Sequence, residues 1–297
     1  MKRRDFLKCT GVTALALTHS VAHSRAVRFT DKLCLNESTS MSHDFDVCMK
    51  AYSKAGIRHV EPWIHKIRPY VEKESIPVAK QLLGDLGLHA PCSCCMGELI
   101  EPREDHAQRV EQLKANLELV SALGIERFVV HSFTQEQYTL DDYKRGIENV
   151  RQLGEIGQEF GVIIVIEFIR MQRFMGTLPT ALSLTRGADH PNVRPLFDFF
   201  HFWAGQGKMQ DLDLLREGEL EHVHFHDAAD GPREILVDKD RVFPGEGVIP
   251  MKEILRVLRR KKYNGYFSIE LFDKEIQDAD PFLMAQKAIE TGSRFLT

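Results

Sequence analysis

The residues best suited to chemistry in this sequence are histidines and acids at the ends of short apolar runs. His222, His224 and His226 are spaced by two, so a β-strand would direct all three imidazoles to one face. Three further apolar runs each end on a single acid, and these acids are Glu167, Asp198 and Glu270. A buried carboxylate without a partner is very costly, so acids that converge must share protons or a cation. Two Glu, one Asp and one His form a mixed oxygen and nitrogen ligand set, which favours one divalent ion such as Mn, Co, Mg or Zn.

Alternating strand-like and helix-like segments would have to position these residues. Short β-type runs are expected at 33–36, 59–62, 87–91, 127–131, 162–167, 193–198, 221–226 and 265–270. Helical spacing of apolar residues lies between them, at 44–55, 76–86, 105–123, 141–160, 179–186, 211–216, 251–261 and 281–295. Eight such repeats favour a (β/α)8 TIM barrel over an open sheet, and no Gly-x-Gly-x-x-Gly follows the first strand. The site of such a barrel lies at the C-terminal ends of the strands, where Glu61, His89 and His131 are also expected.

Length and composition are those of one globular domain. The 297 residues are 43% hydrophobic and 28% charged, with a net charge of -4. This acidic balance argues against a nucleic-acid partner, and no run reaches the ~18 apolar residues of a membrane span. Three of the six cysteines crowd together at Cys92, Cys94 and Cys95, which is too clustered for a disulfide framework and favours packing or loop roles. We expect residues 27–297 to form the single domain.

The first 26 residues have the features of an export leader. Paired arginines at Arg3 and Arg4 precede Phe6-Leu7-Lys8, which resembles a twin-arginine signal, and a mildly apolar stretch follows. Small residues up to position 26 offer sites for a signal peptidase. We therefore expect residues 1–26 to be a leader and the protein to be periplasmic; the alternative is a basic, frayed terminus on a cytoplasmic protein.

Several short motifs together resemble the xylose isomerase-like TIM barrel superfamily. They are Ile166-Glu167, Asp198-x-x-His201, the run from His222 to Asp227, Ser268-Ile269-Glu270, Gly245-Glu246-Gly247 and His89-Ala90-Pro91. Intervals of 31, 26 and 46 residues separate Glu167, Asp198, His224 and Glu270, and the resemblance extends from Leu33 to the C-terminus. The superfamily contains sugar and inosose isomerases, 3-epimerases, related dehydratases and endonuclease IV.

The resemblance implies a ligand set and a list of substrate contacts. Glu167, Asp198, His224 and Glu270 would bind one divalent metal, and His224 is selected among the three histidines because Asp227 follows it at the expected interval. The residues expected to contact substrate are His201, His89, His131, Trp63 and Arg233. Barrels of this kind often pair through the face that carries the site, so a homo-oligomer is compatible with the resemblance.

The paired glutamates indicate a proton-transfer reaction on a sugar or polyol. A metal bound to a carbonyl and the adjacent hydroxyl would acidify the carbon between them and stabilise an enediolate. One of Glu167 and Glu270 would remove the proton and the other would return it, as an isomerase or epimerase of a keto-sugar or inosose requires. The same intermediate expels a β-substituent in a dehydratase or lyase acting on a keto-sugar or 3-keto-glycoside, which stays open as an alternative.

Two other classes of function are less favoured. A sugar-binding barrel without activity would keep aromatic residues such as Trp63 but would not need both Glu167 and Glu270. An endonuclease IV-like enzyme would need a further histidine after Asp240-Arg241, where Val242 stands instead. The acidic balance also argues against a DNA substrate.

Overall fold

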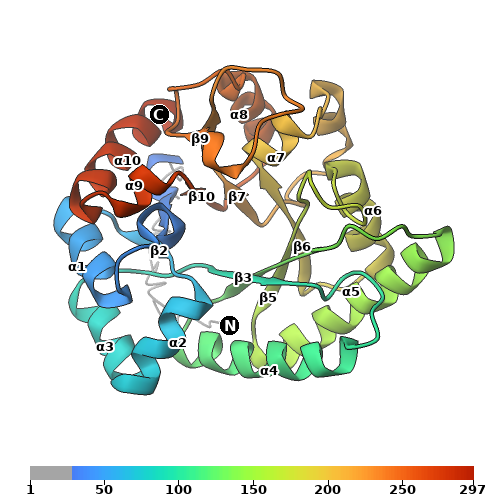
Figure 1. The fold of residues 1–297 in the computed structure, drawn as a ribbon, viewed down its shortest axis with the longest axis horizontal. Helices are drawn as coiled ribbons and strands as arrows, with labels where there is room; N and C mark the ends of the chain where they lie inside the picture. The colour runs from blue at the N-terminus through green and yellow to red at the C-terminus, as the bar shows by residue number, and fades with distance from the viewer. Residues whose placement is uncertain (1–28) are drawn as a thin grey trace, which may run out of the picture.

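The computed structural model describes residues 29–297, so the predicted leader lies outside the described residues and export stays a prediction. Eight strands pair in parallel in the order β2, β1, β10, β7, β6, β5, β4, β3. Their bounds are β1 Leu33–Asn36, β2 His59–Glu61, β3 Ser93–Gly97, β4 Arg127–His131, β5 Ile163–Glu167, β6 Val193–Asp198, β7 His222–His224 and β10 Tyr266–Ile269. Isolated parallel bridges from His59 to His89 and from Trp63 to Cys94 link the two edges of this sheet. The predicted (β/α)8 barrel is confirmed (Figure 1).

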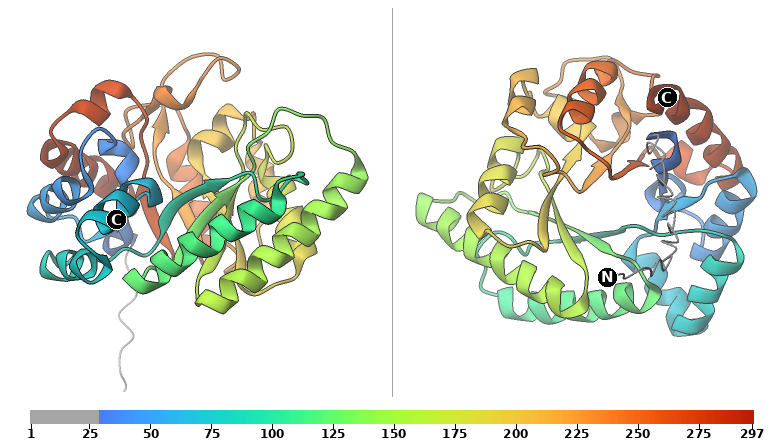
Figure 2. Two further views of the ribbon diagram at one scale, coloured as in Figure 1. Left: turned by 60° about the horizontal axis from the view of Figure 1, so that its bottom comes forward. Right: turned by 180° about the vertical axis from the view of Figure 1, so that it is seen from behind.

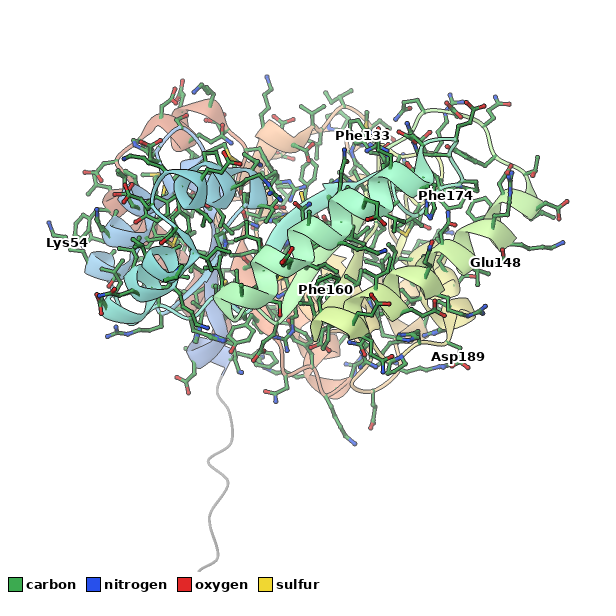
Figure 3. The ribbon with its side chains drawn as sticks, turned by 90° about the horizontal axis from the view of Figure 1, so that it is seen from below. Lys54, Phe133, Glu148, Phe160, Phe174 and Asp189 are labelled. Carbon is green, nitrogen blue, oxygen red and sulfur yellow. The ribbon has the colours of Figure 1, made fainter. Side chains whose placement is uncertain are left out.

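Helices surround the ring of strands (Figures 1 and 2). The larger ones are α1 Phe45–Ala55, α2 Ile64–Lys73, α3 Ile76–Asp85, α4 His106–Leu123, α5 Leu140–Phe160, α6 Leu178–Ala188, α8 Met251–Arg260 and α10 Pro281–Leu296. Two short helices, α7 Phe199–Ala204 and α9 Lys274–Asp278, follow β6 and β10. Helices α4 and α5 run side by side along the outside of the barrel, as Figure 3 shows below Phe133. None of the helices in residues 29–297 has the length and apolar character that a membrane crossing requires.

The alternation of side chains along the strands separates two cores. Phe128 and Val130 of β4 belong to the large core between the sheet and the helices, whereas Val129 packs inside the barrel with Val165 and Leu196. Because the period of a strand is two, the residues that end β5 and β6 face the same way as these inner residues. The barrel interior is therefore apolar below the site, where Val129, Val165 and Leu196 pack, and carries acids and histidines at the C-terminal ends of its strands.

Local sequence signals account for the ends of several helices. Thr139 and Asp142 form a capping box at the start of α5, in which each side chain accepts a hydrogen bond from the other residue's backbone. Helices α4 and α5 end on Gly124 and Gly161, which adopt φ of 80° and 69°. Side chains other than glycine avoid this left-handed conformation, so these glycines stop the helices two or three residues before β4 and β5 begin.

The prediction of the third strand at 87–91 is wrong. The strand is Ser93–Gly97, and the predicted run makes only one bridge, from His89 to His59. The segment Ser93-Cys94-Cys95 has few of the bulky residues typical of strands, and its pairing depends on neighbours such as the Pro62 carbonyl, which accepts from the Cys94 amide. The predicted helix at 211–216 is a 3-10 helix at Met209–Leu214.

Candidate metal centre

Four strands bring the predicted acids and one histidine to a common point. Glu167 ends β5 and Asp198 ends β6, while His224 ends β7 and Glu270 directly follows β10. The register pairs Asp198 with His224 across β6 and β7, and Ser268 with His224 across β7 and β10. One donor atom from each of the four residues lies within 4.8 Å of all the others, and all four side chains are buried.

The ring of His224 is directed so that one nitrogen faces the three acids. Its Nδ1 atom lies 2.7 Å from Glu167 Oε1, 3.2 Å from Glu270 Oε2 and 3.6 Å from Asp198 Oδ2. A nitrogen facing three carboxylate oxygens at such distances is the donor arrangement of a compact N/O metal site.

Glu61, the last residue of β2, holds the other side of that ring. Its Oε1 atom lies 3.3 Å from His224 Nε2, and its Oε2 atom lies 2.9 Å from His222 Nε2. A carboxylate on the outer nitrogen of a ligating histidine fixes its orientation and raises its basicity. Glu61 was named among the strand-end residues but was not assigned a role in the sequence analysis.

Arg241 is the main site residue that sequence reasoning missed. Its Nη1 atom lies 2.8 Å from Asp198 Oδ2 and 2.8 Å from Glu270 Oε2, and its Nη2 atom lies 2.9 Å from His201 Nε2. The guanidinium is buried, so it offsets part of the negative charge of the acids where water cannot. In the sequence, Arg241 stood out only as part of the Asp240-Arg241 pair that resembles a run in endonuclease IV.

A small hairpin after β7 places Arg241 in the site. Strand β8 (Asp227–Ala228) pairs antiparallel with β9 (Arg241–Val242), with Ala228 opposite Arg241. Asp227 accepts hydrogen bonds from the backbone amides of Ala228, Gly245, Gly247 and Ile249 at 2.8–3.1 Å. A Cβ on Gly247 would lie 2.0 Å from the Ala228 carbonyl oxygen, so this position requires glycine. The Asp227 carboxylate and the Gly-Glu-Gly run therefore fix the loop that carries Arg241.

Charge and burial shift the pKa values of the group in opposite directions. Burial raises the pKa of Glu270 well above its usual value, although His224 and Arg241 oppose this. Burial would also raise the pKa of Asp198, but Arg241, His201 and His226 together outweigh it and hold that pKa well below its usual value. Burial opposes the charged form of His224, yet Glu270, Glu167 and Glu61 raise its pKa well above the ordinary value.

The donor set fits a divalent cation. The acids around His224 raise its pKa, because this point in the barrel stabilises positive charge. Two further groups, Glu61 with Cys92 and His222 and Glu61 with Cys94 and His224, also have suitable donors. Both of these groups depend on Glu61, which does not line the cavity, whereas Glu167 and Glu270 do. The group of Glu167, Asp198, His224 and Glu270 would therefore hold the ion where a substrate can reach it.

A cavity of about 350 Å³ opens above this group, at the C-terminal face. Glu167 and Glu270 line it together with three of the predicted substrate contacts, His201, His131 and Trp63. The indole Nε1 of Trp63 donates to Asn36 Oδ1 at 2.6 Å, and Asn36 Nδ2 donates to Glu270 Oε1 at 3.2 Å. Asn36, at the end of β1, thus joins Trp63 to Glu270, a link that the sequence did not reveal.

Two predicted substrate contacts lie elsewhere. His89 is exposed and bridges to His59 at the N-terminal end of β2, so it lies at the opposite end of the barrel from the acids, and the expected contact is wrong. Its misplacement follows from the error in the third strand. The guanidinium of Arg233 stacks on the Trp203 ring with its carbon 3.3 Å from the ring centre, and Arg233 is not among the residues that line the cavity.

Two of the three clustered cysteines, Cys94 and Cys95, lie in β3 and reach the cavity wall. Cys94 and Cys95 both line the cavity, and the Cys94 thiol lies 4.0 Å from Glu270 Oε1. A hydrogen bond from Cys94, supported by His131, lowers the pKa of Cys95 to about 6. Burial alone would lower the pKa of His131, but its interaction with Cys95 raises it to about 9. The lowered pKa of Cys95 and the raised pKa of His131 favour a thiolate–imidazolium pair in the cavity wall, next to Glu167.

Comparisons with known proteins agree with this geometry. The chain is 28% identical over 272 residues to an inosose isomerase of Halalkalibacterium halodurans, covering 88% of this chain and 93% of that protein. It is 26% identical over 242 residues to a 3-dehydroshikimate dehydratase of Pseudomonas putida, covering 80% of this chain and 37% of that protein. The crystal structure of the IOLI protein with a bound zinc atom superposes with a TM-score of 0.83 at 22% identity, covering 89% of this chain and 98% of that one. The family model described as xylose isomerase-like TIM barrel matches residues 49–297, and the chain belongs to that family.

Proposed function

We propose that the protein is a divalent-metal-dependent isomerase or epimerase of a keto-sugar, an inosose or a related polyol. The observation that carries the proposal is the convergence of Glu167, Asp198, His224 and Glu270, with donor atoms within 4.8 Å of one another beside an open cavity. Similarity to an inosose isomerase over most of both chains supports the same class of substrate.

Glu167 and Glu270 are the groups that would move the proton. Both line the cavity and come from strands on different sides of His224, so they approach a bound substrate from different directions. One carboxylate would accept the proton from the carbon next to the carbonyl, and the other would return it. The cation, when bound to the four ligands, would supply Lewis-acid stabilisation of the negative charge that builds up on the substrate oxygens.

Other residues of the chain would orient the substrate. Arg241 and His201 lie beside the acids and also line the cavity. The N–H groups of Arg241 are directed at Asp198, Glu270, Asp238 and His201, so Arg241 would act on substrate oxygens through its positive charge. Trp63 presents an aromatic face at the rim, which suits the apolar face of a sugar ring.

A dehydratase acting through the same proton abstraction is the second candidate. The similarity to a 3-dehydroshikimate dehydratase favours it, although the present chain spans 37% of that protein. The two reactions differ only after the proton has left, because elimination expels a substituent where isomerisation returns the proton.

The test is incubation of the metal-loaded protein with keto-sugars and inososes in D2O, followed by NMR. We expect deuterium to enter the carbon next to the carbonyl without loss of water, and a chelator to abolish this exchange. An unsaturated product would instead assign the dehydratase reaction. Absence of exchange and of product with every such substrate would contradict the proposal.

Two variants test the carboxylates that would both hold the metal and move the proton. Glu167→Gln and Glu270→Gln retain the shape of each side chain but remove its ability to exchange a proton, so both should abolish deuterium entry. Glu37→Gln is the matched control, because Glu37 is also buried near Trp63 but pairs with Lys66, with Glu37 Oε1 3.0 Å from Lys66 Nζ.

A further inference from the structure

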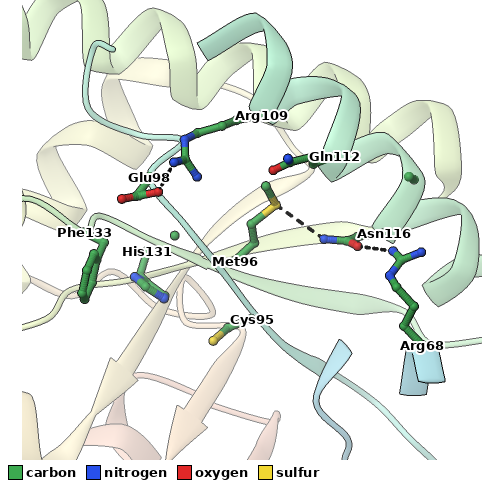
Figure 4. Close-up of a pocket in the computed structure, with 11 residues that line it drawn as sticks. Arg68, Cys95, Met96, Glu98, Arg109, Gln112, Asn116, His131 and Phe133 are labelled. Carbon is green, nitrogen blue, oxygen red and sulfur yellow. Dashed lines mark hydrogen bonds and ion pairs between the residues drawn. The ribbon is translucent and has the colours of Figure 1, made fainter. Parts of the chain in front are cut away.

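A second and larger cavity adjoins the one above the metal centre. It has a volume of about 700 Å³ and lies between the C-terminal ends of β3 and β4 and the helices α2 and α4 (Figure 4). Cys95, His131 and Phe133 line both cavities, so the two share a wall and a ligand can extend from one into the other. The combined space exceeds what one sugar ring requires, since pockets of roughly 300–1,000 Å³ hold drug-sized ligands.

The two arginines that line this cavity differ in whether a carboxylate pairs with them. Arg109, on α4, is paired with Glu98, and its Nε atom lies 2.9 Å from Asp105 Oδ2. Its charge is therefore neutralised by neighbouring carboxylates. Arg68, on α2, donates to Asn116 Oδ1 at 2.5 Å, and no carboxylate of residues 29–297 lies within ion-pair distance of it.

Arg68 is held in place although it lacks an acidic partner. The Asn116 side chain, on α4, donates through Nδ2 to Met96 Sδ at 3.5 Å, which orients its carbonyl oxygen toward Arg68 (Figure 4). A guanidinium has five N–H donors in a fixed planar fork, so one bond to Asn116 leaves several of them for a ligand. Arg68 is half-buried, and an unpaired cation in that position is a ready partner for an anion.

We infer that this second cavity is a subsite for a carboxylate-bearing group of the substrate, with Arg68 as its counter-charge. The inference rests on the proposed function, because it places the reacting carbons between Glu167 and Glu270. The substrate would then be longer than one ring, such as a keto-sugar joined to a second group that ends in a carboxylate. The apolar side chains of Met96 and Phe133 would contact the body of that second group.

The test compares two ligands that differ only in charge. Isothermal titration of the metal-loaded protein would use 4-carboxyphenyl β-D-glucopyranoside and the corresponding uncharged carboxamide. Hydrogen bonds to charged groups contribute enough that we expect about tenfold tighter binding of the carboxylate. In Arg68→Met this preference should disappear while the affinity for the carboxamide stays the same, and Arg68→Lys should keep part of it.

The matched control is Arg260→Met, which removes an exposed arginine on α8, on another side of the barrel. It should leave the preference unchanged, and thermal unfolding should show that Arg68→Met is folded. Equal affinity for the two ligands in the wild type, binding of neither at millimolar concentration, or an unchanged preference in Arg68→Met would overturn the inference.

Failure of the subsite and failure of the proposed function give different results. Exchange of deuterium into free keto-sugars without an Arg68-dependent preference would retain the reaction and remove the subsite. An Arg68-dependent preference without exchange in any keto-sugar would retain the subsite and remove the reaction.

Discussion

The replacement Glu61→Gln tests how the barrel prepares His224 for metal binding. Glu61 is fully buried and its two oxygens contact His224 Nε2 at 3.3 Å and His222 Nε2 at 2.9 Å. Glutamine retains the shape but removes the negative charge, and its amide nitrogen donates toward one of the rings instead of accepting. His224 would then lose the partner that fixes its ring with Nδ1 facing the three acids.

The expected loss can be taken from the behaviour of similar carboxylate–histidine pairs. Removing the outer partner of a ligating histidine typically lowers metal affinity about 10- to 100-fold, or ~1.4–2.7 kcal/mol. Isothermal titration of zinc or manganese into the metal-free protein measures this directly. The control Glu37→Gln removes a carboxylate that is equally buried but lies against Lys66, and it should leave metal affinity within about twofold of the wild type.

The reasoning would be refuted by a Glu61→Gln protein that is folded and binds metal as tightly as the wild type. An equal loss in Glu37→Gln would also refute it, because the effect would then follow from any lost buried charge and not from the orientation of His224.

Two further predictions concern Cys95 and the loop that carries Arg241. Because the pKa of Cys95 is lowered to about 6, its thiolate forms as the pH rises through 6, so alkylation of the metal-free protein by iodoacetamide should level off near pH 7. Peptide mass spectrometry should show slower alkylation of Cys95 at pH 7 in His131→Gln than in the wild type. An alkylation rate that rises only above pH 8 in the wild type would contradict the pairing of Cys95 with His131. Asp227→Ala should lower the free energy of unfolding by about 3 kcal/mol in urea titrations, because four backbone amides lose a charged acceptor. A decrease in the free energy of unfolding below ~1 kcal/mol would show that the loop keeps its conformation without the Asp227 carboxylate.

The regular alternation of strand-like and helix-like segments in the sequence made much of the barrel predictable. The bounds of β4 and β6 agree with the sequence prediction, because in both strands a short apolar run ends on one polar residue, His131 or Asp198. The third strand was misplaced since Leu88 and His89 precede a proline, while the actual strand consists of small and sulfur-containing residues whose pairing depends on neighbouring segments. Helix α2 was not predicted, because its charged composition and the internal Pro69 conceal its helical spacing.

The candidate site was predictable where it depends on strand ends and was not where it depends on loops. Glu167, Asp198 and Glu270 converge because parallel strands in register end on the same side of a barrel. Arg241 reaches the acids only through the hairpin that Asp227 holds, and this contact spans 43 residues from Asp198. Such a contact leaves no periodic signal in the sequence, although a charged residue shortly before the Gly-Glu-Gly run could have suggested it.

The most direct test of the account is the position of a bound metal. Crystals grown with zinc or manganese and measured at the absorption edge of the metal would show its location in an anomalous difference map. The account predicts one strong peak at the C-terminal mouth of the barrel, within bonding distance of Glu167, Asp198, His224 and Glu270. A peak deeper in the barrel between Glu61, Cys94 and His224, or a metal-saturated protein with no peak at the four ligands, would contradict it.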